Sequence, residues 1–141
     1  MRIKIRYNIR KDARRKKRTV TTKQIKYIVR RYSFIEQAIK DGVDEIKFYV
    51  GKRREVIRVD ETIKTVKQII DDVYESEKQE WLKRMMGKIR KGATDVNIII
   101  EFPYEKNAYY MKKKGFIYKV YACCAAKNLV TYEEILNEEI A

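Results

Sequence analysis

The spacing of apolar residues changes several times along the chain, and these changes most constrain what the chain can fold into. In residues 1–10 every second residue is apolar, which predicts a β-strand. Residues 21–41 carry apolar side chains three or four positions apart, which predicts a helix with one apolar face. The same spacing returns from a start near 60–62 and continues to 90, where an unbroken helix over 62–90 would be about 43 Å long. Because that length would overhang a small sheet, we expect a bend or a break near residues 75–78.

Short polar motifs predict where these elements begin and end. Thr21 and Gln24 form a capping box, which predicts a helix start, and Gly42 supplies the left-handed residue that commonly follows a helix end. The alternating segments 45–50 and 55–59 flank a short basic turn, so they predict a β-hairpin.

The rest of the chain completes a proposed topology. Three consecutive isoleucines favour a central strand over 95–102, and 116–122 is interpreted as another strand. A second capping box predicts a short helix over 131–139. The order β-α-β-β-α-β predicts an α+β, ferredoxin-like core with an added C-terminal strand and helix. We expect a single domain over 1–141, with a basic arm or loop at 10–20.

The charge of the chain is concentrated at one end. The 141 residues carry a net charge of +14, and 45% of them are apolar, which is enough for a core. Residues 1–35 contain fourteen Lys or Arg and one acid, whereas residues 36–141 are nearly balanced. Such asymmetry points to a polyanionic partner.

The first helix adds aromatic side chains to this basic region. On a helical wheel, Tyr27 and Phe34 fall among basic residues on the face opposite the apolar stripe. Basic residues neutralise phosphates and aromatic rings stack on exposed bases, so this face is a candidate nucleic-acid site. The alternative is that the C-terminal strand and helix cover both rings. The predicted nucleic-acid-binding residues are Arg10, Lys11, Arg14, Arg15, Lys16, Lys17, Arg18, Lys23, Tyr27, Arg30, Arg31, Phe34, Lys52, Arg53 and Arg54. The run Lys112–Lys114 could extend the same phosphate track.

Several chemistries receive little support from the sequence. The chain has no His, which removes His-based metal sites and the usual catalytic pairs. Its adjacent cysteines, Cys123 and Cys124, cannot form a disulfide framework, and scattered carboxylates give only weak support for a metal-dependent nuclease. The segment 54–59 lacks the aromatic run of an RNA recognition motif. We therefore expect no catalytic residue, no metal and no cofactor.

These observations favour a small, non-enzymatic protein that binds DNA or RNA. The alternative is a phage or mobile-element inhibitor of a nucleic-acid-processing protein complex, of the anti-CRISPR or anti-restriction type. The excess of 19 Ile over 3 Leu, typical of AT-rich coding, makes such an origin plausible. No apolar run reaches the roughly 18–20 residues of a membrane span and no signal peptide opens the chain, so we expect a cytoplasmic protein. The oligomeric state stays open.

Overall fold

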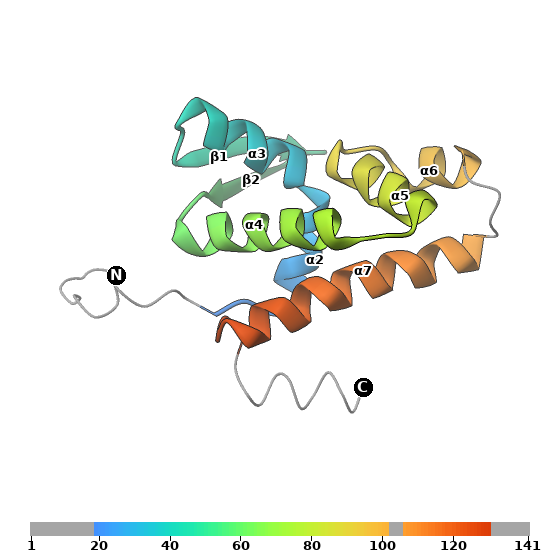
Figure 1. Cartoon of the computed structure of the whole chain (residues 1–141). Coiled ribbons are helices and arrows are strands. Elements are labelled where there is room, and N and C mark those ends of the chain that lie inside the picture. The colour runs from blue at the N-terminus through green and yellow to red at the C-terminus, as the bar shows by residue number, and fades with distance from the viewer. Residues whose placement is uncertain (1–18, 102–105, 131–141) are drawn as a thin grey trace.

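The computed structural model describes residues 19–101 and 106–130, and within these residues 69% are helical. Six helices and one antiparallel pair of strands are formed there (Figure 1). In chain order they are α2 (Thr22–Arg30), α3 (Tyr32–Asp41), β1 (Glu45–Val50), β2 (Arg53–Arg58), α4 (Glu61–Ser76), α5 (Glu80–Arg90), α6 (Asp95–Glu101) and α7 (Lys106–Ala126).

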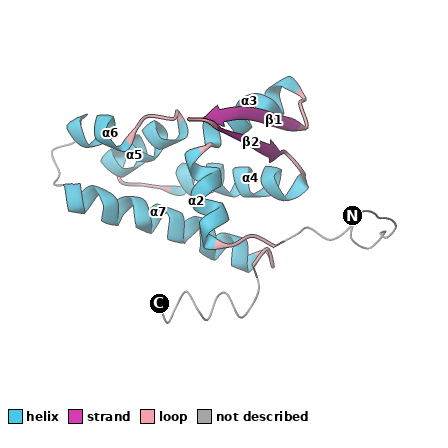
Figure 2. Ribbon diagram, turned by 180° about the vertical axis from the view of Figure 1, so that it is seen from behind, coloured by secondary structure: helices cyan, strands magenta, loops and turns pink. Residues whose placement is uncertain are grey.

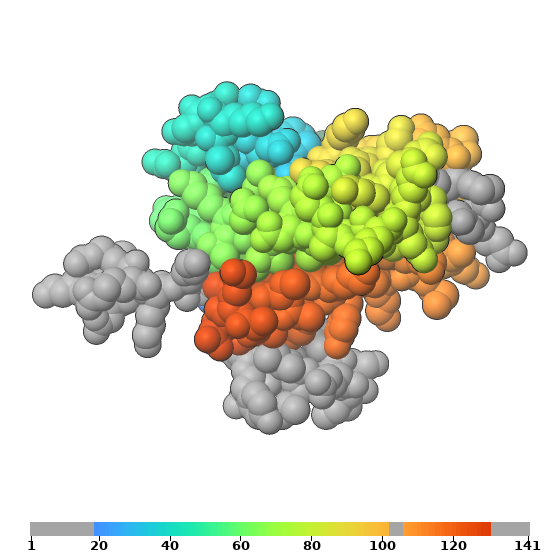
Figure 3. Space-filling model, in the orientation of Figure 1, coloured from blue at the N-terminus to red at the C-terminus, as the bar shows by residue number. Residues whose placement is uncertain are grey.

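The helices pack around one apolar cluster, to which all six of these helices and the hairpin contribute. On the face shown in Figure 3, α4 lies between α3 and the hairpin on one side and α7 on the other. Helix α2 lies behind α4 in Figure 1 and in front in Figure 2, and it packs against both α4 and α7. The Val20 N–H donates to the Leu129 carbonyl at 2.7 Å, which joins the start of α2 to the end of α7.

The local signals at the first helix are confirmed, with one interruption. The Thr21 hydroxyl accepts from the Gln24 N–H at 3.1 Å and the Gln24 side chain accepts from the Thr21 N–H at 2.8 Å. Gly42 has φ 69°, the left-handed conformation that ends the helix. At Arg31 the backbone leaves helical geometry (φ −101°, ψ 14°), so the predicted helix is divided into α2 and α3.

The predicted hairpin and the predicted bend are also confirmed. Strands β1 and β2 pair antiparallel, with Gly51 (φ 64°) in the turn. The pairs Ile46–Ile57 and Phe48–Glu55 lie on the sheet face that turns towards the helices, because alternate residues share a face. The second helix begins after Asp60, whose side chain accepts from the Ile63 N–H at 2.9 Å. It ends at Ser76, the next residue Glu77 is extended, and α5 begins at Glu80.

The expected ferredoxin-like core, including its added C-terminal strand, is wrong, because two predicted strands are helices. Residues 95–101 form α6, whose Thr94 cap accepts from the Asn97 N–H at 3.3 Å. Ile98 is buried there, whereas Ile100 is 75% exposed. A central strand would have both of its faces buried, whereas one of these isoleucines is largely exposed. The three isoleucines are therefore not part of a central strand.

The predicted strand over 116–122 lies within α7. Its buried positions follow a helical spacing, in which two adjacent residues are buried on each turn. These positions are Phe116, Ile117, Val120, Tyr121 and Cys124. The fold is therefore a mostly helical assembly with a two-stranded sheet.

Other expectations lie outside the described residues. They concern the strand over 1–10, most of the basic arm and the helix over 131–139. The expectation of a single domain stays a prediction.

Candidate nucleic-acid interface

A groove of about 970 Å³ lies between α2, the turn after α5, and α7. We call it the α2–α7 groove. Its floor includes the buried side chains of Val29, Ile89 and Ile117. Around them stand six cationic side chains and one acid: Lys26, Arg30, Arg31, Lys91, Lys113, Lys114 and Asp95. The groove therefore has an apolar floor inside a basic rim.

The acid of the groove is already neutralised. Lys113 Nζ lies 2.9 Å from Asp95 Oδ1, and the buried Tyr109 hydroxyl donates to the same oxygen. Desolvation by burial opposes ionisation of Asp95, but these two hydrogen bonds and the positive charges of Lys113 and Arg30 outweigh it and hold its pKa below the ordinary value. Asp95 therefore stays ionised, and the charge of Lys113 compensates it and reduces its repulsion of an incoming anion.

Four cations of the groove lack such partners. Lys26, Arg30, Lys91 and Lys114 form no ion pair with any residue in the described part of the chain. Arg31 differs, because its guanidinium lies 3.5 Å from the Glu55 carboxylate. The four cations surround one apolar floor, an arrangement suited to an anion that also has an apolar part.

Two aromatic rings border the same groove. Phe34 is 49% exposed and stacks on Phe48 of the hairpin, with centroids 5.5 Å apart and planes 13° apart. Tyr110 is 40% exposed and meets Tyr109 edge to face at 5.1 Å. Each ring is thus supported by a second aromatic ring while part of its surface stays open.

The hairpin covers part of the helix face that the sequence predicts to contact nucleic acid. The Tyr27 hydroxyl donates to Glu55 at 2.7 Å, and the Arg31 guanidinium lies over the rings of Tyr27 and Phe48. Burial and the Glu55 hydrogen bond raise the pKa of Tyr27, which stays a neutral donor. The structure therefore uses Tyr27 and Arg31 to attach the hairpin to α2. This cover comes from the hairpin. The C-terminal strand of the alternative is part of α7, and its C-terminal helix lies outside the described residues.

The remaining predicted residues are distributed over three places. Arg30 and Phe34 border the α2–α7 groove, and Lys23 is exposed on α2, two turns before Arg30. The exposed hairpin residues Lys52, Arg53 and Arg54 do not line the groove, and Arg53 pairs with Glu55 at 3.0 Å. Outside the described residues lie Arg10, Lys11, Arg14, Arg15, Lys16, Lys17 and Arg18.

Three groove residues were not predicted from the sequence. Lys26 follows Lys23 by three positions and precedes Arg30 by four, a helical spacing that could have identified it. Lys91 and Tyr110 had no comparable signal, because only tertiary packing brings them beside α2.

A smaller hollow of about 420 Å³ shares Ser33 and Lys91 with the groove. Two of its cations are already paired: Lys88 lies 2.9 Å from Glu101, and Arg90 lies 3.0 Å from Asp71. Internal pairing reduces their availability to a ligand, so the α2–α7 groove is the stronger candidate.

Metal and thiol chemistry find little basis in the described residues. No group of three or more Cys, Asp or Glu is placed there to hold a metal ion. Cys123 is exposed and Cys124 is buried, and burial raises the pKa of the Cys124 thiol to about 11.

In the described residues, no helix combines the length and apolar character that crossing a membrane requires. No protein-family model, curated protein or solved structure matches the chain.

The Asp95 contacts predict a pH-dependent contribution to stability. Because folding lowers the pKa of Asp95, its ionised form stabilises the fold above the unfolded-state pKa of about 3.9, and this contribution is lost as pH falls through the folded value. Asp95→Asn should lower the free energy of unfolding by about 0.5–1.5 kcal/mol at pH 7, since Asp95 is partly exposed. Urea unfolding at pH 7 and pH 3 measures the difference, which should shrink at the lower pH. An equal difference at both values would contradict the role given to the carboxylate.

Proposed function

We propose that this protein binds nucleic acid through the α2–α7 groove, without catalysing a reaction. The observation that carries the proposal is that Lys26, Arg30, Lys91 and Lys114 surround one groove in which Asp95, the single acid among its described lining residues, is held by internal partners. Phosphates bound there would release counterions, which is the main source of affinity for proteins of this kind.

The charge of the whole chain supports the same conclusion. Helix α2, which supplies Lys26 and Arg30, belongs to the segment 1–35 that holds almost all the net charge. A positive end raises the local concentration of a polyanion and steers it towards the groove. We assign this activity to the cytoplasm, where the free thiols of Cys123 and Cys124 suit a reducing environment.

A matched pair of charge variants tests the proposal. The groove variant carries Gln at Lys26, Arg30, Lys91 and Lys114. The control variant also removes four positive charges, from exposed cations that line neither hollow and form no ion pair among the described residues: Lys40, Arg58, Lys78 and Lys127. Affinity for fluorescent DNA and RNA oligonucleotides is measured by anisotropy over a range of salt concentrations.

The groove variant should lose affinity by about 10- to 100-fold, because each exposed contact contributes up to about 1 kcal/mol. Its log–log salt dependence on single strands should be shallower by up to about 2.8, from about 0.7 for each phosphate that is no longer neutralised. The control variant should show a small change from the general field alone. Equal losses in the two variants would remove the groove from the proposed function.

The inhibitor alternative predicts a different outcome. Affinity purification of the full chain from cells, with and without nuclease treatment, separates the two ideas. A stoichiometric protein that stays bound after nuclease would favour an inhibitor of a protein complex. Loss of every partner on nuclease treatment supports direct binding of nucleic acid.

A further inference from the structure

The two aromatic rings of the groove are held in place before any ligand arrives. Phe34 stacks on Phe48, and Phe48 is in turn covered by the Arg31 guanidinium at 5.0 Å from its ring centroid. Tyr110 packs against Tyr109, whose hydroxyl is fixed by Asp95. Because the supporting residues already restrict both rings, a ligand that contacts them loses little additional side-chain entropy.

Both rings belong to the same groove as the cations. Phe34 and Tyr110 both line the groove together with Lys26, Arg30, Lys91 and Lys114. With one face of Phe34 occupied by Phe48 in a nearly parallel stack, the 49% that stays exposed includes its other face. A flat apolar surface beside several cations that form no ion pair with the residues the structure describes fits a ligand with flat apolar rings and negative charges a few bonds away.

Nucleic acids offer that combination only when their bases are free. In a duplex each base pair is covered above and below by its neighbours, so only base edges and phosphates are accessible to a protein. In a single strand the bases can turn outward and stack on aromatic side chains, while phosphates follow a basic groove. An aromatic ring in a groove can therefore stack on the bases of a single strand, whereas a duplex offers it no exposed base face.

We propose that the α2–α7 groove selects single-stranded nucleic acid, with unpaired bases stacked on Phe34 and Tyr110 and phosphates along the cationic rim. This inference rests on the proposed function and adds the class of ligand. The cations supply the salt-dependent affinity that a duplex would share, and the rings add affinity that only a single strand gains.

The experiment uses the full chain with a fluorescent oligothymidylate of about 12 nucleotides, within the usual range of single-strand site sizes, and a duplex of equal length. Wild type should bind the single strand at least about tenfold more tightly. Phe34→Leu and Tyr110→Leu keep an apolar side chain and remove the flat ring. Each should weaken single-strand binding by about 5- to 150-fold, without changing the salt dependence or duplex binding.

A matched control and the charge variants make the outcomes distinguishable. Tyr118 is 56% exposed on α7 but does not line the groove, so Tyr118→Leu should bind like wild type. If the groove charge variant loses binding while both ring variants bind the single strand normally, stacking is wrong and the proposed function stands. Equal affinity for duplex and single strand also overturns this inference. If the groove charge variant behaves like its control, the proposed function fails together with the inference.

Discussion

Phe116→Ala should lower the free energy of unfolding by about 3–5 kcal/mol, whereas Tyr118→Ala on the same helix should change it by less than about 0.5 kcal/mol. Phe116 is 1% exposed, because it lies on the face of α7 that packs against α2, α4 and α5. Its removal leaves a cavity that the neighbouring helices can fill only in part. Tyr118 is 56% exposed, so its truncation opens no comparable cavity. Urea unfolding followed by circular dichroism measures both changes.

The same pair distinguishes a helix from a strand in this segment. A strand would place Phe116, Tyr118 and Val120 on one face, so both aromatic substitutions would be costly. A helix places Ile117 beside Phe116 in the core, and Ile117 is 7% exposed. Ile117→Ala should therefore cost about 2–5 kcal/mol. A large loss of stability for Tyr118→Ala together with a small one for Ile117→Ala would contradict the helical α7.

Local signals of short range were the reliable part of the sequence. The capping box at Thr21, the glycine at 42 and the turn at Gly51 each satisfy a backbone requirement within a few residues, and all three are found where expected. The bend between α4 and α5 followed from a limit on helix length. These features need no knowledge of distant partners.

Two predicted strands failed for a physical reason. β-branched residues favour strands only weakly, and tertiary context overrides that preference when no neighbouring strand is available. Ile98 is buried on α6 and Ile99 packs partly against the core, while Val96 is 64% exposed, so only one side of the segment meets the core. In α7 the basic residues before Gly115 concealed the helical spacing that continues from Tyr109 to Cys124.

The candidate site was predictable in part. The sequence placed Arg30 and Phe34 in a basic, aromatic region, and both border the groove. Lys91 lies just after α5 and Tyr110 lies on α7, both distant in the chain from α2, so no local pattern predicts their proximity to it. The sequence also placed Tyr27 in the site, but its hydroxyl donates to Glu55 on a strand 28 residues away. No local pattern predicts that contact.

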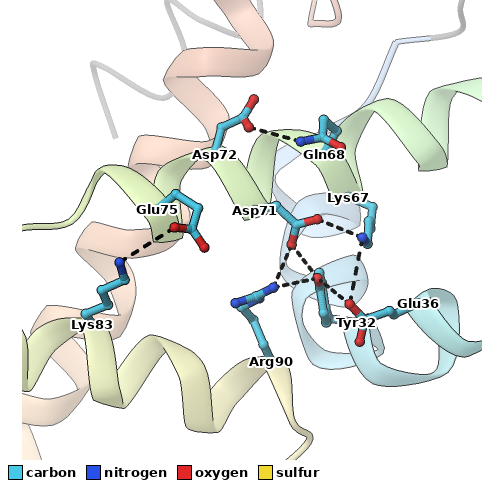
Figure 4. A network of polar contacts seen from close by, with 9 residues as sticks. All are labelled: Tyr32, Glu36, Lys67, Gln68, Asp71, Asp72, Glu75, Lys83 and Arg90. Carbon is cyan, nitrogen blue, oxygen red and sulfur yellow. Dashed lines mark hydrogen bonds and ion pairs between the residues drawn. The ribbon is translucent and has the colours of Figure 1, made fainter.

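The turn that carries Lys91 is held by a polar network at the end of α5 (Figure 4). The Tyr32 hydroxyl donates to Asp71, and Arg90 Nη2 donates to Asp71 at 3.0 Å and to the Tyr32 oxygen at 3.1 Å. Lys67 Nζ lies 2.7 Å from the second Asp71 oxygen. Burial, followed by the Asp71 hydrogen bond, raises the pKa of Tyr32, so it stays a neutral donor. The network joins α3, α4 and α5 immediately before the groove.

Asp71→Ala should lower the free energy of unfolding by about 2–4 kcal/mol, because it removes the carboxylate partner of the Arg90 guanidinium. The Tyr32 hydroxyl also loses its Asp71 acceptor and keeps the contact with Glu36 at 3.1 Å. The Asp71 and Arg90 side chains are 16% and 22% exposed, so water can replace only part of that interaction. Asp72, the next residue on α4, is the matched control. It is exposed, and its carboxylate accepts a hydrogen bond from Gln68 at 3.0 Å. Asp72→Ala should cost less than about 0.5 kcal/mol.

The double variant Asp71→Ala, Arg90→Met separates the ion pair from simple loss of packing. Asp71→Ala removes the carboxylate partner of Arg90, whereas in Arg90→Met the Asp71 carboxylate still has Lys67 at 2.7 Å. The double variant removes both charges of the Asp71–Arg90 pair. Its cost should therefore be smaller than the sum of the single costs by about 1–3 kcal/mol, as measured by urea unfolding at low salt. Additive costs would show that Asp71 and Arg90 stabilise the fold independently.

Because Lys91 follows Arg90 directly, binding of single strands at the α2–α7 groove should weaken in the Asp71→Ala variant even where the protein is fully folded. Unchanged affinity of the folded variant would show that the turn keeps its position without the network.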